Sequence, residues 1–185
     1  AMAQAYRDAG VAVYYADPEN APTPNQMFMA DLFVMTPEGA ILARPASRVR
    51  AGEERVAARR RANLGIQIVR SSSGQATIEG ADLMWLNEKT VIVGRGLRTN
   101  DAGVAQLRAV LAEMGVETIA IDMPIGSMHL MGMLRIVAHD LALAWPLRLV
   151  WRGVETLQKH GYRVAYLPDD QEARALHAFN FVTIG

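Results

Sequence analysis

Polar side chains recur at intervals of about fifty residues in this 185-residue chain, at the points where three repeated segments begin. Glu79 and His129 occupy equivalent positions in the second and third segments. Repeats that curl around an axis bring equivalent positions together. A carboxylate beside a histidine orients the ring and raises its pKa, which suits general acid–base chemistry. The candidate residues are Asn25, Asp31, Glu79, Asp82 and His129.

The same residues also have structural interpretations. Asn25, Asp31 and Asp82 could cap turns, because short polar side chains accept hydrogen bonds from nearby backbone N–H groups. His129 could be a histidine whose hydrogen bonds are satisfied inside the fold. Their recurrence at one place in the repeat favours a shared site.

Three repeats must position these residues. Each is expected to contain two strands, a helix and a third strand, and such units bury their apolar faces only by stacking. The expected ranges are strands 26–35, 82–86 and 130–137, strands 40–44, 90–94 and 141–145, helices 52–63, 101–114 and 149–160, and strands 66–69, 116–121 and 162–167.

The chain is expected to form a single domain over residues 1–185, because no change in composition marks a boundary. The units span approximately 22–70, 75–121 and 126–168, with fragments of further units at 1–16 and 177–185. Outside the units we expect a helix at 2–9, a strand at 11–15, a proline-rich loop at 17–24, a helix at 169–176 and a strand at 179–184. The methionines of the first strands are expected to fill the core, namely Met27, Met29, Met35, Met128, Met131 and Met133.

Composition restricts the possible partners and chemistry. Nineteen basic residues balance nineteen acidic ones, so no net charge favours nucleic acid or an anionic membrane. No apolar stretch approaches the ~20 residues of a membrane span. With no signal peptide at the start, a cytoplasmic location is expected. The sequence contains no cysteine, which excludes disulfides, thiolate metal sites and a cysteine nucleophile within it.

A metal-dependent hydrolase is a further possibility. It would use His129, His139, Asp140 and Asp82 as ligands. However, His139 falls in an expected hairpin turn, away from the strand that carries the site, and no compact ligand motif is present. No metal or other cofactor is therefore expected.

Five segments, in this order, resemble the guanidino-group-modifying enzymes, which include arginine deiminases, dimethylarginine dimethylaminohydrolases and amidinotransferases. Those families have Pro-Asn…Phe-Thr-Arg-Asp, Ala-Arg-Arg-Gly-Glu, Phe-Glu-Gly-Gly-Asp, Gly-x-Gly-x-Arg-Thr-Asn and His-Leu-Asp. The resemblance covers nearly the whole chain. It implies an α/β fold, namely a fivefold β/α-propeller (pentein). About three of the five units would be present, so the propeller would be truncated at both ends. The matching segments are 24–31, 48–54, 78–82, 94–100 and 129–130.

The resemblance also implies roles for the central residues. Asp31 would bind a substrate guanidinium, because a carboxylate pairs with its N–H groups in a bidentate manner. Glu79 and His129 would hold the other side and transfer protons as the amine leaves. In this family a cysteine thiolate attacks the guanidinium carbon and forms an amidino-thioether intermediate.

Further residues would bind the rest of the substrate. Arg50 and Arg98 would hold its carboxylate, although surface ion pairs with Glu53, Glu54 or Asp101 are the alternative. Asn25 would help to position the substrate. Asp82 would either join the substrate-binding set, cap the turn or support the site from behind.

Two departures from the family pattern affect the predicted function. Met131 stands where arginine deiminases have a second substrate-binding aspartate. One side of the pocket would then be more apolar and would tolerate N-methylated or otherwise substituted guanidines better, which argues against arginine itself. The absent cysteine means that turnover by this chain alone is not expected. We therefore expect a guanidino C–N hydrolase scaffold whose remaining segments are lost or supplied by another chain. The alternative is a non-catalytic, oligomerising or ligand-binding protein, and in both cases a second copy or a completing chain would cover the open edges.

Overall fold

The computed structural model describes residues 1–18 and 21–184. Glu19 and Asn20 of the expected loop, and Gly185 of the expected C-terminal fragment, lie outside the described residues. Across this described part, no helix is both long and apolar enough to cross a bilayer.

The described part of the chain forms three small sheets, one in each expected unit. In every sheet the second strand lies in the middle, antiparallel to the first and parallel to the third. The strands are β1 (Phe33–Thr36), β2 (Gly39–Leu42), β3 (Ile68–Ser71), β4 (Leu83–Asn87), β5 (Thr90–Arg95), β6 (Glu117–Asp122), β7 (Leu134–Ala138), β8 (Leu141–Ala144) and β9 (Arg163–Tyr166).

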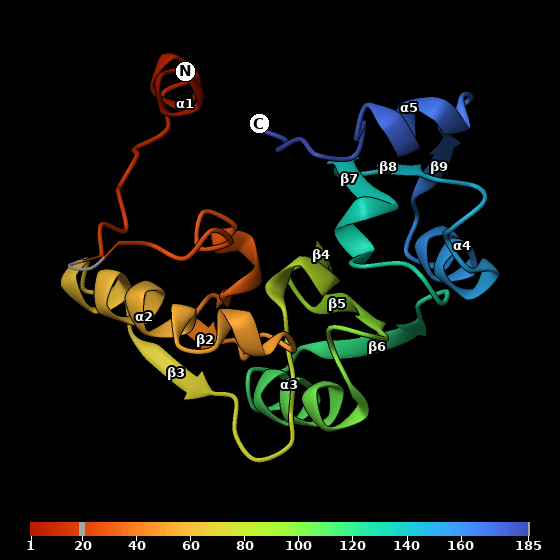
Figure 1. The fold of residues 1–185 in the computed structure, drawn as a ribbon. Coiled ribbons are helices and arrows are strands. Elements are labelled where there is room, and N and C mark those ends of the chain that lie inside the picture. The colour runs from red at the N-terminus through yellow and green to blue at the C-terminus, as the bar shows by residue number, and fades with distance from the viewer. Residues whose placement is uncertain (19–20, 185) are drawn as a thin grey trace.

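Helices connect the parallel strands, as such a crossover requires. They are α2 (Glu53–Asn63), α3 (Asp101–Glu113) and α4 (Trp151–Lys159), and α1 (Met2–Asp8) and α5 (Asp170–Ala175) lie outside the units. Figure 1 shows the three units following one another in an arc, with α1 and the C-terminal segment on its open side. The mixed α/β fold with repeated ββαβ units is confirmed.

Short 3₁₀ turns replace the beginnings of two expected first strands. They are η1 (Met29–Asp31) and η4 (Leu130–Gly132), and η3 (Gly80–Asp82) and η2 (Arg48–Arg50) are further turns of this kind. Their backbone N–H groups bond to carbonyls three residues earlier, as Asp31 does to Phe28, so these residues are not paired in a sheet. Consequently the predictions of strand at 26–32 and 130–132 are wrong.

Two further strand predictions, at residues 11–15 and 179–184, are also wrong. Both segments lack strand structure. A strand requires a hydrogen-bonded neighbour, and the described sheets pair strands only within each unit.

The apolar clusters lie within the units and extend across the boundaries between them. One cluster joins Val34 and Ile41 of the first unit to α3 and the strands of the second. A second cluster joins Ile92 and Ile121 of the second unit to Leu134 and its neighbours in the third. The first and second units therefore each bury apolar side chains against the unit that follows.

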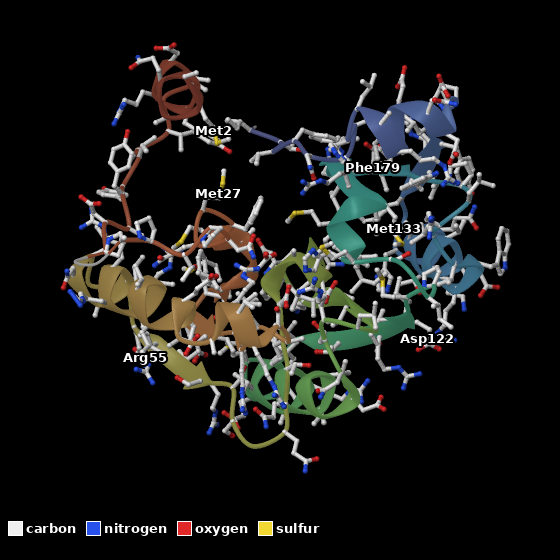
Figure 2. All side chains as sticks on the ribbon, viewed as in Figure 1. Met2, Met27, Arg55, Asp122, Met133 and Phe179 are labelled. Carbon is white, nitrogen blue, oxygen red and sulfur yellow. The ribbon has the colours of Figure 1, made fainter. Side chains whose placement is uncertain are left out.

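The methionines divide between core and surface. Met133 is buried, but Met27 is 72% exposed, and Met35 and Met128 are also exposed. Figure 2 shows Met27 standing clear of the ribbon, whereas Met133 lies between its turn and the neighbouring α4 region. The expectation of core filling is therefore wrong for these three exposed methionines. Met27 and Met128 lie in the segments that lead into the units, and Met35 is on the exposed face of β1.

The first two units approach closely at Gly80. A Cβ atom at this position would lie 2.3 Å from the carbonyl oxygens of Ala30 and Phe33, which belong to the first unit. Backbone atoms cannot yield as a flexible side chain does, so only glycine fits here.

We predict that Gly80→Ala destabilises the fold by about 1–3 kcal/mol, because the added methyl group overpacks the boundary between units. Gly132→Ala is the matched control, since Gly132 lies in the corresponding 3₁₀ turn and its added Cβ meets no atom of the described residues within 4 Å. Urea unfolding followed by circular dichroism would measure both variants. Equal stability of the two would contradict the close approach.

Candidate active site

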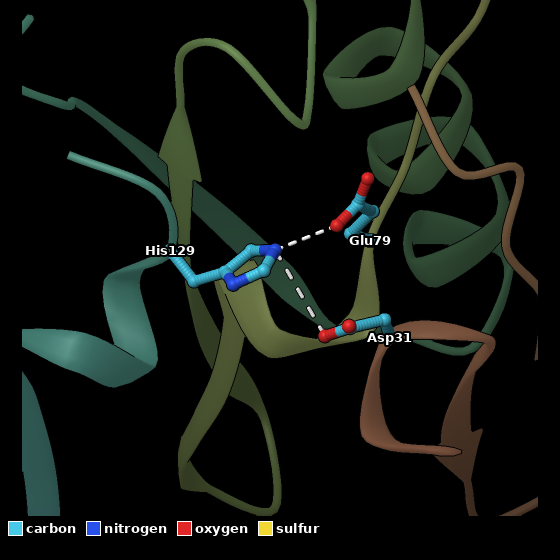
Figure 3. Close-up of side chains that lie close together, drawn as sticks. All are labelled: Asp31, Glu79 and His129. Atoms are coloured by element: carbon cyan, nitrogen blue, oxygen red, sulfur yellow. Dashed lines mark hydrogen bonds and ion pairs between the residues drawn. The ribbon is translucent and has the colours of Figure 1, made fainter. Parts of the chain in front are cut away.

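Three predicted residues converge from three units. Asp31 ends η1, Glu79 precedes η3 and His129 precedes η4. The Nε2 atom of His129 lies 2.6 Å from Oε2 of Glu79 and 3.9 Å from Oδ1 of Asp31. Figure 3 shows the imidazole ring pointing toward both carboxylates. The turns that replaced the expected strands therefore bring these side chains together.

Glu79 is the most enclosed of the three, with no exposed surface. Besides His129, its carboxylate accepts hydrogen bonds from the backbone N–H of Ala46, at 3.0 Å, and from Nη1 of Arg98, at 3.3 Å. Burial raises the pKa of this carboxyl group, but the bonds from His129 and Ala46 and the charges of His129 and Arg98 outweigh it. The net effect is a lowered pKa, so Glu79 is held as a carboxylate.

His129 is largely buried, and opposing influences act on its pKa. Burial lowers the pKa of the imidazole, whereas the hydrogen bond to Glu79 and the charges of Asp31, Asp82 and Glu79 raise it. The net effect is a raised pKa, which favours the imidazolium form. A protonated histidine beside carboxylates can donate a proton to a departing amine.

The guanidinium of Arg50 already forms an ion pair with the carboxylate of Asp31. Its Nη1 atom lies 2.5 Å from Oδ2 of Asp31, and its Nε atom lies 2.8 Å from Glu53. Its Nη2 atom donates to the backbone carbonyls of Asn25 and Phe28. The Arg50 residue is only 4% exposed. The alternative of a surface ion pair with Glu53 therefore has the right partner but the wrong environment.

Electrostatics reinforce this placement of Arg50. Burial lowers the pKa of its guanidinium, but the hydrogen bonds and charges of Asp31 and Glu53 outweigh it, and the net effect is a raised pKa. To bind a substrate carboxylate, as the sequence suggested, Arg50 would have to exchange these contacts for new ones.

Arg98 has a more open position. Its side chain is 23% exposed and its Nη1 atom reaches Oε1 of Glu79. The alternative partner Asp101 instead pairs with Arg95, at 2.8 Å. Asn25 is half-buried beside the site, where its backbone carbonyl accepts a hydrogen bond from Nη2 of Arg50. The substrate-binding roles of Arg98 and Asn25 remain predictions.

Asp82 lies behind the site rather than in it. Its Oδ2 atom accepts a hydrogen bond from the hydroxyl of Thr99, at 2.7 Å, and its Oδ1 atom accepts one from the backbone N–H of Leu130, at 3.0 Å. Burial raises its pKa to about 6, even though both bonds oppose this shift. A substrate would have to displace one of these bonds to reach Asp82.

Two residues at the site had no site role assigned from the sequence, where Glu53 was named only as a possible surface partner of an arginine. Glu53 anchors Arg50, and Thr99 joins Asp82 to the backbone of Glu79. Both belong to segments that carried the family resemblance, so the motifs contained the signal although only their arginines had been assigned roles.

The residues named for a metal-dependent hydrolase do not come together as a ligand set. Asp140 pairs with Arg163, at 3.3 Å, and His139 is exposed in its turn. Within the described residues, the group whose ligand atoms could converge on a metal is Asp31, Glu79 and His129, all within 4.8 Å. A guanidinium already lies against two of these, since Nη1 of Arg50 is also 3.9 Å from Glu79. The cluster is therefore an ion-pair network, and we assign no metal centre to it.

The repeated units and this charged cluster define the class of guanidino-group-modifying proteins. The sequence profile described as arginine deiminase matches residues 6–147, which is most of the chain. The chain therefore belongs to the arginine deiminase family.

Individual relatives support the same class. An N(G),N(G)-dimethylarginine dimethylaminohydrolase of Streptomyces coelicolor is 34% identical over 98 residues, which are 53% of this chain and 37% of the relative. A dimethylarginine dimethylaminohydrolase adduct superimposes with a TM-score of 0.75 at 22% identity, over 91% of this chain and 65% of that one.

A further structural relative is the substrate-bound N-terminal domain of ArgZ, a cyanobacterial arginine dihydrolase. It superimposes with a TM-score of 0.85 at 16% identity, over 98% of this chain and 66% of that one. These superpositions confirm the pentein type of fold. The chain spans less than two thirds of the length of these relatives.

The ionisation of His129 predicts a pH-dependent stability. A pKa raised by folding contributes stability that is complete below the unfolded value and is lost as the pH rises through the folded value. Between about pH 7 and about pH 9, the free energy of unfolding should therefore fall more in the unmodified protein than in His129→Gln. Urea titrations at both pH values would measure this difference.

His139→Gln is the control for that measurement, because His139 is exposed. It should show the same pH dependence as the unmodified protein. Asp82 does not interfere, since its titration near 6 is largely complete at the lower pH. An unaltered pH dependence in His129→Gln would contradict the raised pKa.

Proposed function

We propose that this chain binds an arginine-like guanidino compound between Asp31, Glu79 and His129, and that it is the scaffold of a guanidino C–N hydrolase. The observation that carries the proposal is the buried Glu79–His129 contact at 2.6 Å with Asp31 beside it. A planar cation with paired N–H donors is the natural partner of two converging carboxylates.

The same geometry suits proton transfer during C–N cleavage. The leaving amine must take up a proton, and His129 is held in a form that can donate one. The carboxylate of Glu79 stabilises the imidazolium and binds one edge of the substrate. Asp31 binds the opposite edge and fixes the plane of the guanidinium.

The attacking group must come from outside the 185 residues. The sequence contains no cysteine, and the proposed reaction requires a thiolate nucleophile. Two structural relatives, the ArgZ domain bound to substrate and a Pseudomonas aeruginosa dimethylarginine dimethylaminohydrolase complexed with citrulline, were crystallised as cysteine-to-serine mutants. We therefore expect this chain alone to bind a guanidino compound without converting it.

The preferred substrate within this class is an N-methylated arginine. Met131 is half-buried in η4, two residues after His129, where an aspartate would otherwise add a charge. A thioether tolerates methyl groups better than a carboxylate does, because it needs no hydrogen bond from the substrate. The Streptomyces relative, whose name specifies dimethylarginine, supports this preference.

A completing chain or a second copy remains part of the proposal. Large apolar side chains are exposed in the third unit, including Leu147 and Trp151, and after it at Leu176. Burying them against a partner would be favourable. A non-catalytic ligand-binding or oligomerising protein is the alternative, and it too would bind guanidino compounds without turnover. Adding a thiol-bearing partner segment and finding turnover would separate the two.

We predict that N-methylated arginine raises the melting temperature of this chain by about 5 °C or more at ~100 times Kd, because a ligand that binds only the folded state stabilises it. Asp31→Asn should abolish the shift, since an amide cannot accept two charge-assisted bonds from a guanidinium. Differential scanning fluorimetry would measure both, and a parallel assay should detect no citrulline.

Asp122→Asn is the matched control, because Asp122 is exposed and pairs with Arg95 away from the site. It should retain the full ligand-induced shift. An unchanged shift in Asp31→Asn would refute the binding role of Asp31. Citrulline formation by the unmodified chain would refute its dependence on an outside nucleophile.

We further predict that Arg98→Gln weakens binding of arginine about tenfold but leaves agmatine, which lacks the carboxylate, nearly unaffected. Charge-assisted contact with the substrate carboxylate is lost only for arginine. Calorimetric titration of both ligands into both proteins would measure the ratio. Equal losses for the two ligands would show that Arg98 acts through Glu79 instead.

A further inference from the structure

A buried line of hydrogen bonds joins the backbone of Glu79 to the backbone next to His129. The N–H of Glu79 donates to Oγ1 of Thr99, at 3.2 Å, and the hydroxyl of Thr99 donates to Oδ2 of Asp82, at 2.7 Å. The N–H of Leu130, directly after His129, donates to Oδ1 of Asp82 at 3.0 Å. Thr99 and Leu130 have no exposed surface, and Asp82 is 2% exposed.

This line closes a ring with the side chains of the site. On one side the Glu79 and His129 side chains meet at 2.6 Å. On the other side Thr99 and Asp82 connect the backbones that carry them. At the site, the second and third units are thus joined by two polar connections, one of which is the proposed proton-transfer pair itself.

We propose that Thr99 and Asp82 are positioning residues that set the separation and ionisation of the Glu79–His129 pair. The inference rests on the proposed function for its catalytic meaning, but the contacts that carry it are independent of any ligand. Residues that hold reacting groups from behind matter because small displacements of those groups cost much of their effect.

A carboxylate at position 82 does what a neutral side chain could not. Each of its oxygens accepts one bond, from Thr99 and from Leu130, whereas an amide offers one accepting oxygen. Its negative charge also helps to raise the pKa of His129, together with Asp31 and Glu79. Burial of that charge opposes folding, as the pKa of about 6 indicates, so stability alone does not account for the residue.

Thr99→Val tests the proposal, because valine has nearly the same shape but offers no hydroxyl. We expect the pKa of His129 to fall by about half a unit or more, since the pair loosens when the connection is broken. Heteronuclear NMR titration of the imidazole would measure it, and the spectrum of His129→Gln would identify the signal. Thr99→Ser, which restores the hydroxyl, should restore the pKa.

Thr118→Val is the matched control. Thr118 is also a buried threonine, on β6, and its hydroxyl has no hydrogen-bond partner among the described residues. This variant should leave the His129 titration unchanged. An unchanged pKa in folded Thr99→Val, or an equal fall in Thr118→Val, would overturn the proposal.

If Thr99→Val does not fold, Asp82→Asn is used to test the proposal instead. It keeps an acceptor for Leu130 but removes the charge, so the pKa of His129 should fall, and an unchanged value would overturn the proposal. Because these titrations use the chain without ligand, their outcome is separate from that of the guanidino-binding tests. If the His129 titrations give the expected results but no guanidino compound binds, the proposed function alone would be contradicted.

Discussion

The rest of the site depends on the enclosure of one carboxylate, that of Glu79. An ionised carboxylate without exposed surface is stable only where hydrogen bonds and opposite charges replace water. Glu79 receives these from His129, Arg98 and the backbone of Ala46, which belong to all three units. The three units must therefore be in register before this charge is satisfied. The same condition that stabilises the fold also assembles the chemistry.

Packing between units supplies the energy for that arrangement. The two large apolar clusters each draw on neighbouring units, so apolar surface is buried at both boundaries. Polar residues then fix the alignment that apolar packing leaves adjustable, since the hydrophobic effect has no direction. The contacts of Asp82 with Thr99 and Leu130, and of Trp85 with the carbonyl of Met35, lie at these boundaries.

The sequence was sufficient to predict the repeats, the helices to within about two residues and the convergence of Glu79 with His129. It was insufficient for the 3₁₀ turns at the unit entrances, because apolar residues such as Leu130 and Met133 fit a strand pattern equally well. The burial of Arg50 was also unpredictable. Local sequence places it three residues from Glu53, as in many surface pairs, whereas its enclosure depends on Asp31, nineteen residues earlier.

That enclosure bears on how a substrate could enter. Arg50 presents to Asp31 the same group that an arginine-like ligand would present, and it does so from within the chain at high effective concentration. A ligand guanidinium alone competes poorly with such a partner. Contacts elsewhere, such as a carboxylate bound by Arg98 or by a released Arg50, would offset the exchange. Recognition of the amino-acid end of such a ligand would therefore help its guanidinium to replace Arg50 at Asp31.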